Sequence, residues 1–168
     1  ETKIFSDEAF AGKTALISGG TSGIGRAAAA LFLAGGARVV LMGRGAERGV
    51  RALGELAAGE RTRFVQGDVR LRADCARAAQ ETIRAYGAID ILINSAGLYR
   101  EGALDDLTED LLEELIATNV KGTFYLTQAA LPYLRVSHGN IVNVASDAGL
   151  HGNYFCAAYA ATKGAVIA

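Results

Sequence analysis

Three residues near the end of the printed sequence could together move a proton. Tyr159 and Lys163 are four residues apart, and Ser146 precedes the tyrosine. Positions i and i+4 share one helix face, so we expect the Lys163 ammonium close to the Tyr159 ring. A neighbouring cation favours the ionised form of a phenol, which would let Tyr159 act as a general acid or base near neutral pH. Ser146, after an apolar run, would hold a carbonyl or alcohol oxygen.

A tyrosine and a lysine four residues apart on a helix are, by themselves, most often a packed ring and a solvated charge. A glycine-rich stretch near the start of the chain changes this interpretation. Glycine allows a tight turn after a strand and lets the backbone approach a pyrophosphate. The following helix N-terminus offers free N–H groups to phosphates. The stretch therefore predicts a dinucleotide site. Its candidate contacts are Gly19, Thr21, Ser22, Gly23, Ile24 and Gly25.

The residue after the second expected strand bears on which dinucleotide binds. NAD-binding domains of this type place an acidic residue there, whereas this chain has Gly43-Arg44. A carboxylate would repel a 2′-phosphate, and a guanidinium can bind it bidentately and stack on adenine. Thr21 and Ser22 could add hydroxyl donors. Arg44 could also be a solvated residue that opens a helix, so NADP(H) is favoured and NAD(H) remains an alternative.

Alternating strands and helices are expected to position these residues. Apolar stretches rich in β-branched residues alternate with stretches of helical period, which is typical of βαβ units. We expect strands at 14–18, 38–42, 63–66, 89–94 and 140–145, and helices at 24–34, 46–58, 72–86, 108–134 and from about 154. Thr108 could cap the long helix, and Pro132 lies near its end. The short apolar strands predict helices on both faces of the sheet. The expected fold is an α/β, doubly wound parallel sheet of the Rossmann type.

Composition limits the class of protein. The 168 residues, 51% of them hydrophobic, predict one globular domain, and no linker or repeat divides the chain. The net charge is −1, with 17 basic and 18 acidic residues interspersed, which argues against nucleic acid or an anionic membrane as partner. No apolar run approaches the ~20 residues of a membrane span, and the leader 1–12 lacks a signal pattern. These features predict a cytoplasmic protein.

The cysteines and histidines do not suggest a metal site. Cys75 and Cys156 lie far apart, without a CxxC pattern or a histidine at ligand spacing. We therefore expect two buried thiols and neither a disulfide nor a metal. His138 and His151 are expected to be loop residues, and His151 could border a substrate.

Several further motifs accompany the glycine-rich stretch. They are Asp68-Val69 after the third strand, Asn94-Ser95-Ala96-Gly97 after the fourth, Asn119 in the long helix, Ser146, and Tyr159-Ala160-Ala161-Thr162-Lys163. Together with the glycine stretch they resemble the short-chain dehydrogenase/reductase family over about residues 13–168. The chain resembles its 3-oxoacyl-carrier-protein reductases and its sugar dehydrogenases equally.

The resemblance implies roles for the proton-transfer residues. Tyr159 would be the catalytic acid/base. Lys163 would favour its ionised form and bind the nicotinamide ribose, and Ser146 would orient the substrate oxygen. Asn119 would hold a water that links the lysine to solvent, although it could also simply bond to the backbone.

The resemblance also implies further cofactor contacts. These are Asp68 and Val69 at the adenine, and Asn94, Ala96 and Gly97 from the fourth strand onward. Asn94 could also brace the sheet. The chain departs from the family at Ser95, where asparagine is usual, and at Ser18, which replaces a threonine and keeps its hydroxyl.

The leading functional hypothesis is an NADP(H)-dependent oxidoreductase that moves a hydride between the nicotinamide and a ketone or secondary alcohol. One alternative is a dinucleotide-sensing module without chemistry, which would be expected to lack a catalytic residue. Another is an NAD(P)-dependent epimerase or dehydratase, whose glycine spacing is usually Gly-x-x-Gly-x-x-Gly rather than the Gly-x-x-x-Gly-x-Gly found here. The sequence specifies neither the substrate nor the direction of reaction.

The last residues, 164–168, have the composition of the middle of a helix. Members of the family continue there with further strands and a substrate lid. The chain is therefore expected to be truncated after its fifth strand and the start of its catalytic helix. Residues 1–168 would form a single dinucleotide-binding domain. The resemblance also implies a homo-oligomer, a dimer or tetramer, formed through the helix at 111–134 and the Tyr/Lys helix.

Overall fold

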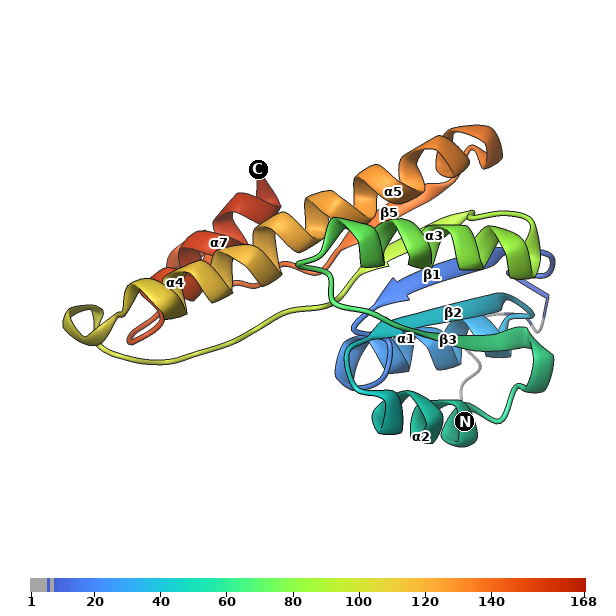
Figure 1. The fold of residues 1–168 in the computed structure, drawn as a ribbon, viewed down its shortest axis with the longest axis horizontal. Coiled ribbons are helices and arrows are strands. Elements are labelled where there is room, and N and C mark those ends of the chain that lie inside the picture. Colours follow the sequence, from blue (N-terminus) through green and yellow to red (C-terminus); the bar gives the residue numbers. More distant parts are fainter. Residues whose placement is uncertain (1–5, 7) are drawn as a thin grey trace.

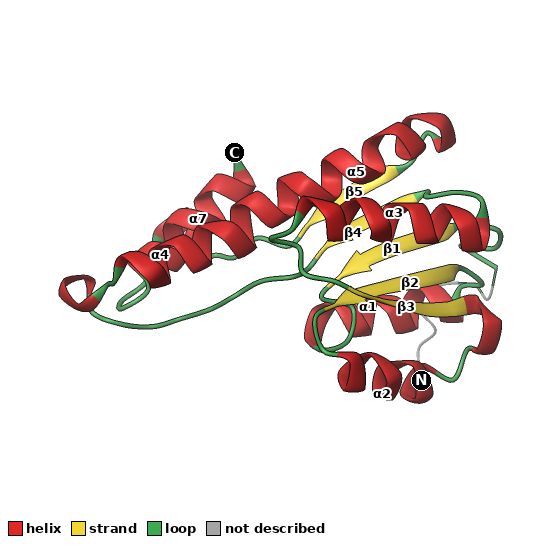
Figure 2. Ribbon diagram, viewed as in Figure 1, coloured by secondary structure: helices red, strands yellow, loops and turns green. Residues whose placement is uncertain are grey.

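A parallel sheet organises the computed structural model, which describes residue 6 and residues 8–168 (Figures 1 and 2). Within that part its strands are β1 (Thr14–Ser18), β2 (Arg38–Gly43), β3 (Thr62–Gln66), β4 (Ile91–Asn94) and β5 (Asn140–Asn143). Their spatial order is β3-β2-β1-β4-β5, and all neighbours are parallel. The chain thus winds outward from β1 in both directions, which confirms the doubly wound α/β fold.

Helices cover the sheet from both sides. The helices α1 (Gly23–Ala34) and α2 (Ala46–Leu56) lie on one face, and α3 (Arg72–Tyr86) and α5 (Gly122–Ser137) on the other (Figure 2). A rod of α4 (Glu109–Leu115) and a π-helical segment, η3 (Ile116–Lys121), leads into α5. The helices α6 (Ala148–His151) and α7 (Ala157–Ile167) pack together. Figure 1 shows α4 and α7 beyond the carboxyl ends of the strands. Short 3-10 turns lie at η1 (Gly59–Arg61) and η2 (Leu104–Asp106).

The core has two layers because successive strand residues point to opposite faces. Leu16 and Val40 join a cluster with α3 and α5, whereas Ile17 and Leu41 join a cluster with α1 and α2. All four side chains are fully buried, and each such burial stabilises the fold by about 1.5–3 kcal/mol. Ile17 lies opposite Leu41 of β2 and Ile93 of β4. This packing holds the carboxyl ends of the central strands in register.

The expectation of helices on both faces is wrong for β5. All of its residues are exposed, and the apolar Ile141 and Val142 are 38% and 50% exposed. Among the described residues β5 pairs only with β4. The apolar side chains of β5 are therefore not buried in this structure.

The segment before Tyr159 also differs from expectation. The last helix begins at Ala157 rather than near Tyr154, and the short α6 was not expected. Phe155 has a φ of +55°, a left-handed conformation that interrupts a helix. The Asp147 carboxylate accepts a hydrogen bond from the Ala148 N–H at 2.8 Å and caps α6. The other strand and helix bounds agree with the sequence prediction to within three residues.

The structure also bears on the predicted helix cap and on the two cysteines. Thr108 caps α4, since its hydroxyl accepts from the Leu111 N–H at 3.2 Å. Both cysteines are buried free thiols, as predicted, and burial raises the pKa of Cys75 to about 12. Among the described residues no helix is long and apolar enough to cross a membrane. The same part of the chain contains no group of acidic, histidine or cysteine side chains that could hold a metal. Residues 1–5 and 7 of the leader lie outside the described residues.

Candidate active site

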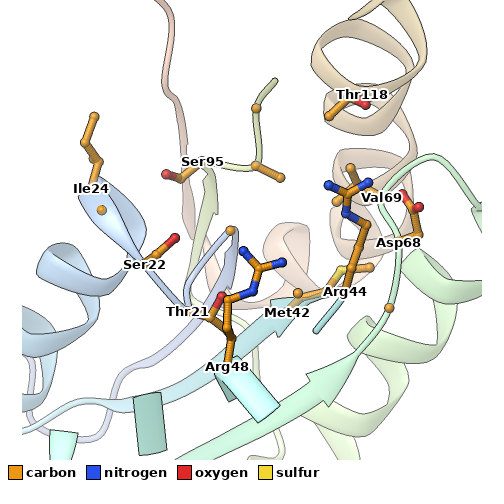
Figure 3. Close-up of a pocket in the computed structure, with 16 residues that line it drawn as sticks. Thr21, Ser22, Ile24, Met42, Arg44, Arg48, Asp68, Val69, Ser95 and Thr118 are labelled. Carbon is orange, nitrogen blue, oxygen red and sulfur yellow. The ribbon is translucent and has the colours of Figure 1, made fainter. Parts of the chain in front are cut away.

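A cavity of about 420 Å³ opens at the carboxyl ends of β1, β2 and β4 (Figure 3). Open parallel sheets bind ligands at this place, where the strand order reverses. Most of the residues predicted for the cofactor line it. They are Gly19, Thr21, Ser22, Gly23, Ile24, Arg44, Asp68, Val69, Ala96 and Gly97.

The glycine stretch forms one wall because side chains would not fit there. Gly19 has a φ of +65°, and a Cβ on it would lie 2.8 Å from the Ala96 backbone nitrogen. A Cβ on Gly25 would lie 2.6 Å from the Gly19 carbonyl oxygen, so α1 packs directly on the turn although Gly25 does not line the cavity. The Ser18 hydroxyl accepts from the backbone N–H groups of Ser95 and Ala96, both at 3.2 Å. These two bonds tie the two cavity loops together.

Asp68 is held in place at the opposite rim. Its Oδ2 accepts from Arg70 Nε and Nη2 at 2.9 and 2.7 Å, and its Oδ1 accepts from the Arg70 N–H at 3.0 Å. Burial raises the pKa of this carboxyl, but the hydrogen bonds and charge of Arg70, with a smaller contribution from Arg44, outweigh burial and lower the pKa. Asp68 is therefore ionised at neutral pH.

Tyr159 and Lys163 share one face of α7. Lys163 Nζ lies 5.8 Å from the centroid of the Tyr159 ring and donates to the Val144 carbonyl oxygen at 2.6 Å. The lysine is buried, and this burial lowers the pKa of its ammonium. Tyr99 meets the Tyr159 ring edge-on, with centroids 4.8 Å apart. The tyrosine is thus held between a fixed cation and a second aromatic ring.

Asn119 links this face to the cavity. It lies in the π-helical segment, a feature frequent at functional sites. Its Oδ1 accepts from the Leu98 N–H at 2.8 Å, and its Nδ2 donates to the Leu98 carbonyl and to Thr162 Oγ1, both at 2.9 Å. A Cβ on Gly97 would lie 3.6 Å from Asn119 Oδ1 and 3.7 Å from Lys163 Nζ. Gly97 lines the cavity, so both side chains lie at its border.

Six of the predicted site residues do not line the cavity: Gly25, Asn94, Asn119, Ser146, Tyr159 and Lys163. Among these, Asn94 and Ser146 bond to residues outside the predicted site. Asn94 donates from Nδ2 to Thr127 Oγ1 at 3.0 Å and to Asn143 Oδ1 at 2.8 Å, which braces β4 against α5 and β5. The Ser146 hydroxyl donates to Asp147 Oδ1 at 3.0 Å. No hydrogen bond joins these two described residues, Ser146 and Tyr159.

Four side chains that line the cavity were not predicted as site residues: Met42, Arg48, Ser95 and Thr118. Arg48 is in the first turn of α2, and Thr118 precedes Asn119 in η3. The available signal for Arg48 was its spacing, four residues after Arg44. Thr118 had no signal beyond its neighbour.

Comparisons with known proteins identify the family. A family model described as short chain dehydrogenase matches residues 13–168. L-fucose dehydrogenase from Mus musculus is 38% identical over 160 residues, which are 95% of this chain and 58% of the relative. Cis-2,3-dihydrobiphenyl-2,3-diol dehydrogenase from Paraburkholderia xenovorans (strain LB400) is 38% identical over 163 residues, 93% of this chain and 57% of the relative.

A solved structure gives the same result for the fold. It is a short-chain dehydrogenase/reductase from Brucella melitensis, described as a glucose/ribitol dehydrogenase, with a TM-score of 0.90 and 34% identity. The match covers 94% of this chain and 66% of that one. The present chain therefore spans less than two thirds of the length of these relatives.

Proposed function

The chain belongs to the short-chain dehydrogenase family, and on this premise we propose that it is part of an NADP(H)-dependent oxidoreductase that interconverts a ketone and a secondary alcohol. One observation carries the proposal. Gly97 lies on the cavity wall and also beside Lys163 Nζ. A dinucleotide in the cavity would therefore reach the face that carries Tyr159.

The cavity residues fit a dinucleotide. Gly19 lines the cavity and carries no side chain, so a pyrophosphate can approach its backbone closely. The N-cap of α1, Ser22, makes no side-chain capping bond, so the first backbone N–H groups of the helix remain free to bind phosphate. Arg44 stands where an acidic residue would disfavour NADP(H). This arrangement supports NADP(H) over NAD(H).

The chain's own residues would manage the proton, while the bound nicotinamide supplies or accepts the hydride. Tyr159 would give its hydroxyl proton to the carbonyl oxygen in reduction and take it from the alcohol in oxidation. Lys163, fixed by the Val144 carbonyl, would keep a positive charge beside the ring and stabilise the tyrosine after its proton has left. Asn119 would help to carry the proton between Lys163 and solvent.

Ser146 would hold the substrate oxygen. Its hydroxyl now donates to Asp147, so it would first rotate about its Cα–Cβ bond to donate to a carbonyl. In the alcohol direction it could instead accept from the substrate hydroxyl without leaving Asp147. Relatives named for L-fucose and for a dihydrobiphenyl diol support a substrate that carries hydroxyl groups.

The test is a turnover screen of the whole protein. Small ketones, sugars, diols and other secondary alcohols would be offered with each nicotinamide cofactor, and the absorbance of the reduced nicotinamide would be followed. We expect turnover with at least one of these compounds and faster turnover with the NADP(H) couple. Tight dinucleotide binding without turnover of any compound would instead favour a sensing module.

A further inference from the structure

We infer that Arg48 is a second specificity residue, whose guanidinium binds the 2′-phosphate of NADP(H) together with Arg44. This inference rests on the proposed function. Both side chains line the same cavity. Figure 3 shows Arg48 rising from α2 beside Thr21, whereas Arg44 leaves the end of β2 on the side of Asp68 and Val69. A group at the ribose end of the cavity would thus meet guanidinium groups from two elements.

The sequence around Arg48 explains why it reaches the cavity. A Cβ on Gly49 would lie 2.3 Å from the Phe64 ring, so its absence lets the first turn of α2 pack directly on β3. A Cβ on Gly45 would lie 3.0 Å from Arg48 Nε. The missing side chain at Gly45 therefore leaves room for the guanidinium to fold back toward the end of β2.

Neither of the two arginines has a direct partner for its charge among the described residues. Within residue 6 and residues 8–168, neither guanidinium donates a hydrogen bond or lies in an ion pair. Asp68 acts electrostatically on Arg44, but Arg70 already binds both oxygens of that carboxylate. Arg48 also lies in the first turn of α2, where a cation is unfavourable because the helix dipole is positive there. An anion bound by both guanidinium groups would neutralise these charges.

The ligand chemistry follows from the number of donors. A guanidinium presents five N–H donors in a planar fork that matches phosphate oxygens. Two such groups on one cavity suit a phosphate monoester, which carries close to two negative charges at neutral pH. The ribose of NAD(H) has only neutral hydroxyls there, so Arg48 would add little to its binding.

The experiment measures the dissociation constants of NADP+ and NAD+ by calorimetry for the whole protein and its variants. Arg48→Gln should weaken NADP+ binding by roughly 10- to 100-fold, as expected for a lost charge-assisted bond, and change NAD+ binding by less than about threefold. Arg44→Gln should act similarly, and the double variant should lose the preference for NADP+. Gly45→Ala, which crowds Arg48 without changing charge, should weaken NADP+ binding by a smaller factor.

Arg51→Gln is the matched control, since Arg51 is an exposed arginine on the same helix that does not line the cavity. An Arg48→Gln variant that behaves like Arg51→Gln, while Arg44→Gln loses the preference, would overturn the inference and leave the proposed function standing. Equal binding of both dinucleotides by the wild type would overturn the NADP(H) preference and the inference together. Failure to bind either one would overturn the proposed function itself.

Discussion

Lys163 combines a buried charge with a fixed position, which makes it the most informative single residue of the site. Its ammonium donates to the Val144 carbonyl and lies near the Tyr159 ring. Burial lowers its pKa, so the folded protein binds this proton less tightly than the unfolded chain does. The free energy of unfolding should therefore rise as the pH approaches the usual lysine pKa of 10.5 from below.

Lys163→Met should remove this pH dependence, because methionine fills similar space without a titrating group. We expect the unfolding free energy, measured with urea at several alkaline pH values, to rise less steeply than in the wild type. Lys121→Met is the control, since that lysine is exposed and paired with Glu113. Parallel pH profiles for wild type and Lys163→Met would show that the buried charge is not the cause.

The sequence predicted the proximity of Tyr159 and Lys163 because helical spacing alone brings the two side chains together. It could not identify Arg48. Whether an arginine in a first helical turn faces a cavity or solvent depends on the packing of Gly49 against Phe64, residues that come from different elements. Contacts of this kind have no local signal.

Among the elements, the π-helical segment η3 has the clearest consequence for the site. It places Asn119, which is 1% exposed, so that its amide binds both backbone groups of Leu98 and the Thr162 hydroxyl of α7. The Asn119 side chain thus joins three parts of the fold. They are the π-helical segment between α4 and α5, the loop after β4, and the helix α7 that carries Tyr159. Loss of this amide should loosen all three.

Asn119→Leu keeps the size of the side chain and removes its hydrogen bonds. Unsatisfied buried backbone groups each cost about 1–3 kcal/mol, so we expect the unfolding free energy to fall by about 2–4 kcal/mol in urea. Thr123→Val, which removes only a bond within the helix to the Asn119 carbonyl, should cost about 1 kcal/mol or less. A stability loss for Asn119→Leu no larger than that of Thr123→Val would contradict the linking role of the amide.

Long periodic elements were predictable, and the short ones around the site were not. The helix at Arg72–Tyr86 matches its predicted bounds because its apolar period and the following Gly87 define it. The left-handed Phe155 and the extra residue per turn in η3 are uncommon conformations. No residue type in those segments requires these conformations, so they could not be predicted from the sequence.

For the complete fold, the alternation of strands and helices was sufficient to predict the sheet. It did not reveal which apolar residues remain exposed. In the long helix Leu115 and Leu126 are buried, whereas Phe124 is 61% exposed. Phe124 also borders a hollow of about 240 Å³ between α5, β5 and α7. This is the face through which the family resemblance implies a homo-oligomer.

We therefore expect Phe124→Asp to shift the whole protein toward smaller assemblies. Losing one buried phenylalanine from each side of a twofold interface costs about 3–6 kcal/mol, or roughly 10²- to 10⁴-fold in the dissociation constant. Light scattering over a range of concentrations would measure the shift. Val50→Asp, at a residue 68% exposed on α2, should leave the mass unchanged. A monomeric wild type would refute the oligomer.

In the proposed function the cavity and Tyr159 serve one reaction. The most direct measurement compares NADPH affinity and turnover in Tyr159→Phe, using a substrate found in the turnover screen. This change deletes one oxygen and keeps the ring, so NADPH affinity should stay within about twofold while turnover falls by the ~10²–10⁴-fold typical of losing a general acid/base. Tyr99→Phe keeps its ring contact with Tyr159 and should retain turnover. Near-native turnover in Tyr159→Phe would show that its hydroxyl is not the acid/base of the reaction.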